Sequence, residues 1–238
     1  MPIYAVLRYA SVNKEIIAKN VEFYNLGDYM IKRDRYLNQL INAKDNGFPK
    51  VITGVRRCGK SFLLKEIYRE YLLSQDVPES RIIILELDDD KNSKYRDPLE
   101  LGAYIREKCK DKENYYVFID EIQKVYSIIN PNLTDGKHVL ANSDDTEVIS
   151  FVDVVLGLSR EKNIDLYVTG SNSKMLSSDI VTEFRDKATN IKLSPLSFEE
   201  YYDQYKNKGI ETTFEMNPGN HFKDADLRLA KGIAWILK

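Results

Sequence analysis

A glycine-bounded segment that begins at residue 54 constrains the fold of this chain more than any other stretch. The apolar run 50–53 ends at Gly54, and after four intervening residues Gly59-Lys60-Ser61 opens a segment with apolar residues at helical spacing. G-x-x-x-x-G-K-S is the pattern of a phosphate-binding loop, and it stands in the strand–loop–helix context that such a loop requires. A chance turn rich in glycine and lysine does not account for both the strand before it and the helix after it.

The residue types of this loop suit a nucleoside triphosphate and Mg²⁺. Glycines let the backbone curl so that successive N–H groups point at an anion, and the following helix adds N–H groups and its positive dipole end. Lys60 is expected to reach the β- and γ-phosphates, and the Ser61 hydroxyl to ligate Mg²⁺. The residues predicted to bind the nucleotide here are Gly54, Val55, Arg56, Arg57, Cys58, Gly59, Lys60, Ser61 and Phe62.

Three side chains of this set have more ordinary interpretations. Cys58 is expected to contribute its backbone alone. Arg56 and Arg57 could add positive charge beside the phosphates. Arginines at such loop positions more often point to solvent or to a neighbouring acid, and we expect this of at least one of them.

A second apolar run ends in two acids and complements the loop. Residues 115–119 are hydrophobic and are followed by Asp120 and Glu121, with Asp120 sixty residues after Lys60. At the tip of a buried strand, Asp120 can accept from Mg²⁺-bound water or from Ser61, and Glu121 can orient and deprotonate an attacking water. Such a run is a weak signal by itself, because many buried strands end in acids. Beside a phosphate loop it predicts a Walker B strand and a hydrolase, since a small-molecule kinase does not need that base.

A third apolar run, 164–168, ends in small polar residues. Ligands of a doubly wound sheet bind beyond the carboxyl ends of its strands. Ser171 and Asn172 would then lie near the γ-phosphate and could hydrogen-bond it or the attacking water. Alternatively, Ser171 or Ser173 only caps a helix that begins near Lys174. Both interpretations stay open for each of these residues.

The remaining segments alternate between helical and strand patterns. A nearly continuous apolar strand is typical of a sheet covered on both faces, so we predict an α/β protein with a parallel sheet. On the helix after the loop, Phe62 is expected on the apolar side. Helices are predicted over 30–41, 61–73, 97–110 and 151–162, and further strands over 81–87 and 190–196.

Two polar stretches have less specific interpretations. Residues 127–150 are longer than a usual connection, and we expect a surface insertion beside the site. His138 lies in it, and a lone histidine in a polar loop is more often exposed than catalytic. The three acids 88–90 could bind a metal, but a solvated loop is the commoner role of such a cluster.

Composition limits the partners and compartments to be considered. A net charge of −2 over 238 residues argues against a basic nucleic-acid-binding face. No apolar run is long enough to span a membrane, and the first ten residues lack the order of a signal peptide. Cys58 and Cys109 are too few for a disulfide framework or a metal site. A reducing, cytoplasmic location without a membrane partner is therefore expected.

Four motifs in this order, 54–61, 118–123, 168–173 and 193–201, resemble those of one branch of AAA+-type P-loop ATPases. These are the prokaryotic proteins called ATP-binding protein or AAA family ATPase. The resemblance covers about residues 30–205. It implies a three-layer αβα sandwich around a mainly parallel five-stranded sheet, with ATP and Mg²⁺ as ligands. The prediction of ATP rather than GTP as the ligand rests on this resemblance. The Asn-Lys-x-Asp motif that recognises guanine is absent from the sequence.

The resemblance also implies roles for single residues. Gly54, Gly59, Lys60 and Ser61 would form the phosphate loop, with Ser61 and Asp120 on the metal side. Glu121 would be the base, acting with Lys60 and Asn172, while Ser171 and Asn172 match the sensor position on the fourth strand.

Two departures from the family pattern affect the prediction. Family members usually carry Arg-Gly-Arg-Gly after Glu-Phe, a candidate arginine finger, whereas here Arg185 is kept and Lys187 replaces the second arginine. A lysine is a poorer planar donor to a γ-phosphate, so slow hydrolysis is expected. Members also continue into a helical region and a nuclease-like domain, which residues 206–238 do not resemble. We expect an N-terminal extension over 1–29, an ATP-binding domain over 30–205 and an atypical tail, in a truncated or frame-shifted family member.

Two functions of different kinds follow. The first is a Mg-ATP-binding ATPase with slow hydrolysis, coupled to a protein partner or to a homo-oligomer. The second is a nucleotide-dependent binding switch with negligible turnover. A nucleic-acid motor has little support from the net charge and would need salt-dependent DNA binding.

Overall fold

The computed structural model describes residues 31, 33–111, 113–171, 184, 187–197 and 200. The chain divides into two compact units, Lys32–Ser197 and a second one made of Met1–Ile31 with Phe198–Lys238. Nearly all described residues belong to the first unit. The predicted domain limits at residues 30 and 205, the extension over 1–29 and the tail over 206–238 lie outside the described residues.

Five parallel strands form the centre of the Lys32–Ser197 unit, in the order β2-β3-β6-β1-β7. The predicted α/β fold with a parallel five-stranded sheet is therefore confirmed. β1 leads into the glycine-bounded loop and has a paired neighbour on each side, β6 and β7. The strand bounds are β1 Lys50–Gly54, β2 Ile82–Glu86, β3 Tyr115–Asp120, β6 Ile164–Ser171 and β7 Thr189–Leu193.

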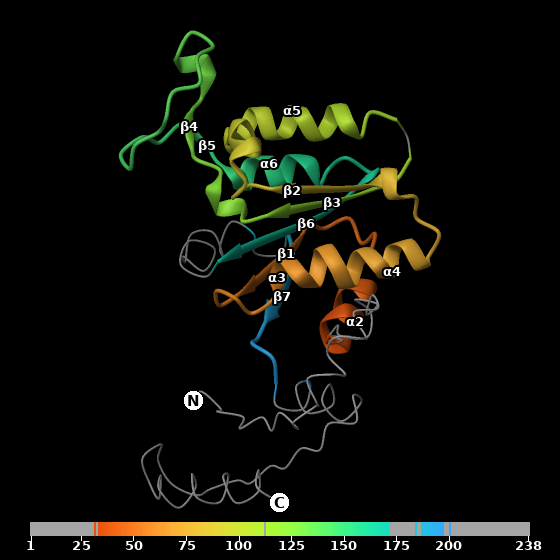
Figure 1. Cartoon of the computed structure of the whole chain (residues 1–238). Helices are drawn as coiled ribbons and strands as arrows, with labels where there is room; N and C mark the ends of the chain where they lie inside the picture. The colour runs from red at the N-terminus through yellow and green to blue at the C-terminus, as the bar shows by residue number, and fades with distance from the viewer. Residues whose placement is uncertain are drawn as a thin grey trace, which may run out of the picture. The chain divides into compact units, whose positions relative to one another are not determined.

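Helices cover both faces of the sheet, so the unit has three layers. α5 and α6 lie on one face, and α2 and α4 lie on the other (Figure 1). Among the described residues, no helix has the length and apolar character needed to cross a bilayer. The helices are α2 Asp34–Ala43, α3 Lys60–Phe62, α4 Arg69–Ser74, α5 Pro98–Lys108 and α6 Phe151–Leu158. Short 3₁₀ segments are η3 Glu79–Arg81, η4 Asp90–Arg96, η5 Ile122–Lys124 and η6 Pro131–Leu133.

Side chains define where α5 and α6 begin. Asp97 accepts hydrogen bonds from two N–H groups of the first turn of α5, and Pro98 occupies the first helical position. Ser150 and Asp153 form a reciprocal capping box at the start of α6. Each cap satisfies helix N–H groups that have no partner within the helix.

The helix after the glycine-bounded loop runs from Lys60 to Ser74, but its middle, η2 Leu63–Tyr68, is π-helical. Phe62 is 43% exposed, so its predicted place on the apolar side is wrong. At about 3.6 residues per turn, Phe62 points to the side of the helix roughly opposite to Leu64 and Ile67, so its apolar character alone does not place it on the buried stripe. The buried residues of the π-helical turn are Leu63, Leu64, Ile67 and Tyr68.

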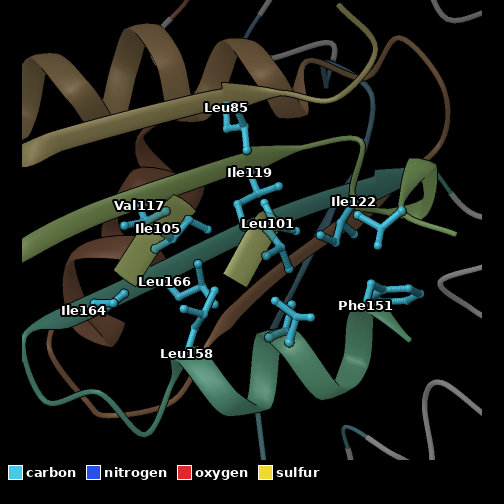
Figure 2. Close-up of a cluster of buried hydrophobic side chains, with 14 of the residues drawn as sticks. Leu85, Leu101, Ile105, Val117, Ile119, Ile122, Phe151, Leu158, Ile164 and Leu166 are labelled. Carbon is cyan, nitrogen blue, oxygen red and sulfur yellow. The ribbon is translucent and has the colours of Figure 1, made fainter. Parts of the chain in front are cut away.

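The largest apolar cluster lies between the sheet and the α5–α6 layer. Figure 2 shows side chains of β2, β3 and β6 meeting those of the two helices, among them Ile119, Leu101 and Leu158. Successive residues of a strand face opposite sides, so Val117 and Ile119 face this cluster. Full burial of a side chain of this size stabilises a fold by about 1.5–3 kcal/mol.

The opposite face of the sheet is aromatic and holds a buried ion pair. The ring of Phe118 lies 5.9 Å from that of Tyr68 and 5.3 Å from that of Tyr167, measured between centroids. Beside them, Lys50 forms an ion pair with Asp165, and the lysine side chain is 0% exposed. Tyr167 also donates a hydrogen bond to Asp165 at 2.6 Å. Because both faces of β3 are buried, its residues are hydrophobic without a break up to Asp120.

Residues 127–150 form an arm that projects away from the sheet (Figure 1). Within it, β4 Ile128–Ile129 and β5 Val148–Ile149 pair antiparallel. His138 is exposed, as expected, but its Nδ1 lies 2.7 Å from a carboxylate oxygen of Asp97. The arm is therefore tied to the start of α5.

Candidate functional site

The carboxyl ends of β1, β6 and β3 lie side by side at one edge of the sheet. Gly54 at the end of β1 is in register with Ser171, and β6 pairs in turn with β3, which ends at Asp120. Neighbouring strands are about 4.8 Å apart, so the strands that end at Gly54 and Asp120 are about 10 Å apart. The glycine-bounded loop and the Asp120–Glu121 pair thus share the edge at which doubly wound sheets bind ligands.

Both glycines of the loop are required by geometry. A Cβ on Gly54 would overlap the carbonyl oxygen of Leu193 and lie 2.7 Å from the Cys58 sulfur. Gly59 has a φ of +93°, a backbone conformation that favours glycine. Between them, Arg56 and Arg57 are both exposed. This agrees with the expectation that at least one of the arginines points to solvent.

Lys60 begins the helix and turns back into the loop. Its side chain is buried, and Nζ donates to the carbonyls of Gly54 and Val55 at 3.2 and 3.1 Å. Ser61 follows in the first helical turn and is half-buried. The ammonium group is therefore held in the curl of the loop, where a phosphate oxygen would offer it a stronger, charged acceptor.

One hydroxyl group holds both acids at the end of β3. Thr169 of β6 is fully buried and donates a hydrogen bond to Oδ1 of Asp120. The same hydroxyl oxygen accepts a hydrogen bond from the N–H of Glu121 at 3.1 Å. Glu121 has a φ of +56°, which is unusual for a residue other than glycine. The Gln123 side chain donates to its carboxylate, so both acids have fixed partners.

Lys65 of the π-helical turn adds a positive charge beside these acids. Its Nζ lies 2.6 Å from Oε2 of Glu86 and 3.8 Å from Oδ2 of Asp120. Partial burial acts to lower the pKa of Lys65, but the hydrogen bond to Glu86 and the charge of Asp120 outweigh it and raise the pKa above its usual value. Lys65 is therefore charged at neutral pH and partly balances Asp120.

Thr169 and Lys65 were missed by the sequence reasoning. Thr169 directly follows the third apolar run, two residues before Ser171, and Lys65 stands in the predicted helix after the loop. The signal that could have found Thr169 is a polar residue inside an otherwise apolar strand. Its partner could be inferred only once β3 and β6 were known to be neighbours.

Some predicted site residues lie outside the described part of the chain. Asn172, Ser173 and Arg185 are among them, and only the backbone of Ser171 is described. Lys187 is exposed, in a turn in which its N–H donates to the Phe184 carbonyl at 3.0 Å. The roles predicted for these residues stay predictions.

Among the described residues, no group of three His, Cys, Asp or Glu side chains is placed so that it could hold a metal ion. The acids 88–90 are exposed, as expected for a solvated loop, and Asp89 accepts a hydrogen bond from the N–H of Lys91 at 3.0 Å. Mg²⁺ usually binds proteins through one or two carboxylates together with substrate phosphates. Asp120 and Ser61 remain the candidates for that kind of site.

The Thr169→Val variant should lower the free energy of unfolding by about 1.5–3 kcal/mol, because valine keeps the shape but leaves a buried carboxylate and a backbone N–H without their partner. Thr169→Ser is the matched control, since it keeps the hydroxyl and loses only a methyl group. Urea unfolding of both variants measures the difference. If the valine variant were as stable as the serine variant, the hydroxyl would not hold the acids.

Comparison with known proteins adds a family and two relatives. Residues 46–202 match the model of a family described as AAA domain. An uncharacterized protein of Haemophilus influenzae is 35% identical over 173 residues, which are 72% of this chain and 37% of that protein. An uncharacterized protein of Methanocaldococcus jannaschii is 25% identical over 216 residues, 88% of this chain and 40% of that protein. The chain thus spans about two fifths of the length of each relative.

Solved structures with a similar arrangement have low sequence identity to this chain. One is from the complex of HORMA, CdnC and Trip13 of E. coli MS115-1, with a TM-score of 0.49, 12% identity and coverage of 90% of this chain and 86% of that chain. Another is C. elegans PCH-2, with a TM-score of 0.44, 14% identity and coverage of 77% and 48%.

The family match covers more than half of the chain. It contains the glycine-bounded loop, the Asp120–Glu121 pair and all five strands of the parallel sheet. The chain therefore belongs to the AAA domain family, a group of nucleotide-binding P-loop proteins of the AAA+ type.

Proposed function

We propose that the chain binds ATP with Mg²⁺, hydrolyses it slowly, and couples the nucleotide state to a protein partner or to a second copy of itself. The observation that supports this most is the shared sheet edge. There the loop that holds the buried ammonium of Lys60 follows β1, the Asp120–Glu121 pair stands at the end of β3, and β6 lies between these two strands. Phosphoryl transfer to water needs a cation on the phosphates, a carboxylate for the metal and a group that orients the water.

The loop residues fit a triphosphate. Gly54 and Gly59 keep a curl that other residues would disturb, so main-chain N–H groups can converge on an anion. Lys60 would exchange the carbonyls of Gly54 and Val55 for phosphate oxygens. In this proposal the main chain over 54–62 surrounds the phosphates.

Ser61 and Asp120 fit Mg²⁺, because hydroxyl and carboxylate oxygens are the ligands that this ion prefers. Asp120 is buried and its Oδ1 is fixed by Thr169, while Oδ2 faces the more distant Lys65. Lys65 has Glu86 as a second partner, so it can give up its interaction with Asp120. When bound, Mg²⁺ would neutralise charge on the phosphate oxygens.

Glu121 is the proposed general base. Its backbone is held by Thr169 and its carboxylate by Gln123, so the side chain has a fixed direction from which it can take a proton from water. Ser171 and Asn172 are proposed to hydrogen-bond the γ-phosphate or that water. Arg185 or Lys187 would be the candidate arginine finger.

A nucleotide-dependent switch with negligible turnover is the second candidate. Lys187 stands where the resemblance expects an arginine and lacks the planar fork of a guanidinium group. This difference favours binding over fast hydrolysis.

The proposal extends to the organisation and location of the chain. We propose that residues 30–205 form the ATP-binding domain, with 1–29 as an extension and 206–238 as a tail. A reducing, cytoplasmic compartment suits the two cysteines, Cys58 and Cys109, which are both free thiols.

Thermal and urea unfolding with ATP, with and without Mg²⁺, test the binding step. ATP at 100 times its dissociation constant should raise the free energy of unfolding by about 2.7 kcal/mol. The rise should be smaller without Mg²⁺, because Asp120 then stands near phosphate charge without a cation between them. No rise at any ATP concentration up to the millimolar range would contradict the proposal.

A further inference from the structure

Arg33 joins the glycine-bounded loop to the end of β7. Its side chain is buried, and its two terminal guanidinium nitrogens bond to different segments. Nη1 donates to the carbonyl of Cys58 at 3.1 Å, and Nη2 donates to the carbonyl of Ser194 at 2.8 Å. Cys58 lies in the loop and Ser194 directly follows β7. One planar group therefore fixes two segments that are distant in the sequence.

The contact at Cys58 sets the direction of an amide that the loop needs. In a trans peptide unit the carbonyl and the following N–H lie in one plane and point in opposite directions. Because Arg33 holds the Cys58 carbonyl on one side, the N–H of Gly59 is directed to the other side. That N–H is among the main-chain groups with which a phosphate loop binds an anion. Arg33 thus acts on phosphate binding without touching the phosphate.

The end of β7 has further contacts with the same elements. The N–H of Ser194 donates to the hydroxyl of Tyr36 at 3.1 Å, and the Arg33 guanidinium lies 4.6 Å from the centre of the Tyr36 ring. At the other end of the loop, Gly54 is in register with Leu193 and touches its carbonyl. The exit of β7 is therefore linked to both ends of the loop, directly at Gly54 and through Arg33 at Cys58.

Both segments that leave the Lys32–Ser197 unit do so next to these contacts. We propose that Arg33 is a positioning residue of the phosphate loop and transmits phosphate binding to the segment that leaves β7. The inference rests on the proposed function, since a phosphate must enter the loop. When a phosphate draws the Gly59 N–H towards itself, the whole planar peptide unit turns and the Cys58 carbonyl moves with it. The rigid fork of the guanidinium then carries this movement to Ser194.

Hydrogen exchange of the full chain without nucleotide tests the link itself. Arg33→Met should speed exchange of the amides over 55–61 and over 193–197 together, by about tenfold, because each segment loses a hydrogen bond to a charged group. Arg160→Met is the control, since it removes an exposed arginine that follows α6, on the other face of the sheet. It should leave both segments unchanged. Faster exchange in only one of the two segments would overturn the link.

Exchange with saturating Mg-ATP tests the transmission. ATP should slow exchange over 193–197 in the parent chain and in Arg160→Met, and should no longer do so in Arg33→Met. Arg33→Lys keeps the buried charge but not the fork, so it should keep the fold and still lose the effect. Equal slowing in Arg33→Lys and in the parent chain would overturn the proposal. If ATP bound neither the parent chain nor any variant, the proposed function would be refuted. Hydrogen exchange without nucleotide would then still test whether Arg33 links the two segments.

Discussion

The Lys60→Ala variant should lose most of the roughly 2.7 kcal/mol of stabilisation that ATP at 100 times its dissociation constant gives the parent chain. Lys60 is the buried cation of the loop, held against the carbonyls of Gly54 and Val55 at the sheet edge. Arg56 and Arg57 are exposed, so neither replaces its ammonium in the curl. Unfolding of the variant with and without Mg-ATP measures the loss.

The fold of the variant should survive, because Lys60 contacts the loop through two carbonyl acceptors and makes no ion pair within the described residues. Lys110→Ala is the matched control: this lysine is 71% exposed and pairs with Glu107 on the surface. Its response to ATP should equal that of the parent chain. A Lys60→Ala chain that ATP still stabilises fully would show that the nucleotide binds elsewhere.

The fold and the shared sheet edge were predictable because their signals are local. Gly54 and Gly59 belong to a pattern of eight consecutive residues, 54–61, and Gly59 is required by its own backbone angle. Asp120 ends an apolar run whose length matches one strand. Once strands and helices alternate, the rules of doubly wound sheets place the ends of the strands together.

The residues that support the site were not predictable, because their partners are far away in the sequence. Arg33 lies in the segment 30–41, which the sequence predicts as a helix without indicating any partner for this side chain, yet it bonds to Cys58 and Ser194. Thr169 acts on Asp120 only because β6 lies beside β3. Each of these contacts depends on the strand order, which no single segment of the sequence encodes.

Two further residues show how local patterns can mislead. Lys50 stands at the edge of an apolar run, where a lysine would be expected at the surface, but its side chain is 0% exposed and pairs with Asp165. Phe62 is apolar and lies next to buried Leu63, but it points to the side of the helix roughly opposite to the buried stripe and is exposed. A buried charge needs a partner, and the partner of Lys50 lies on another strand.

The Glu121→Gln variant should release phosphate from ATP at least about 100-fold more slowly than the parent chain, since general base catalysis contributes about 10²–10⁴ in rate. Glutamine keeps a carbonyl oxygen that can accept the hydrogen bond from Gln123, and the backbone N–H stays on Thr169. The shape of the site should therefore be preserved while the group that takes the proton is lost. Steady-state phosphate release with saturating Mg-ATP measures the change.

Two comparisons separate loss of the base from loss of binding. Stabilisation by Mg-ATP should be unchanged in Glu121→Gln, because the loop and Asp120 are intact. Glu147→Gln, on the exposed surface of the arm, should hydrolyse ATP at the parent rate. Equal phosphate release by Glu121→Gln and the parent chain would remove Glu121 from the mechanism. A parent chain that binds ATP and releases no phosphate above background would instead support the switch, with Glu121 oriented by Thr169 and Gln123 for sensing rather than for proton transfer.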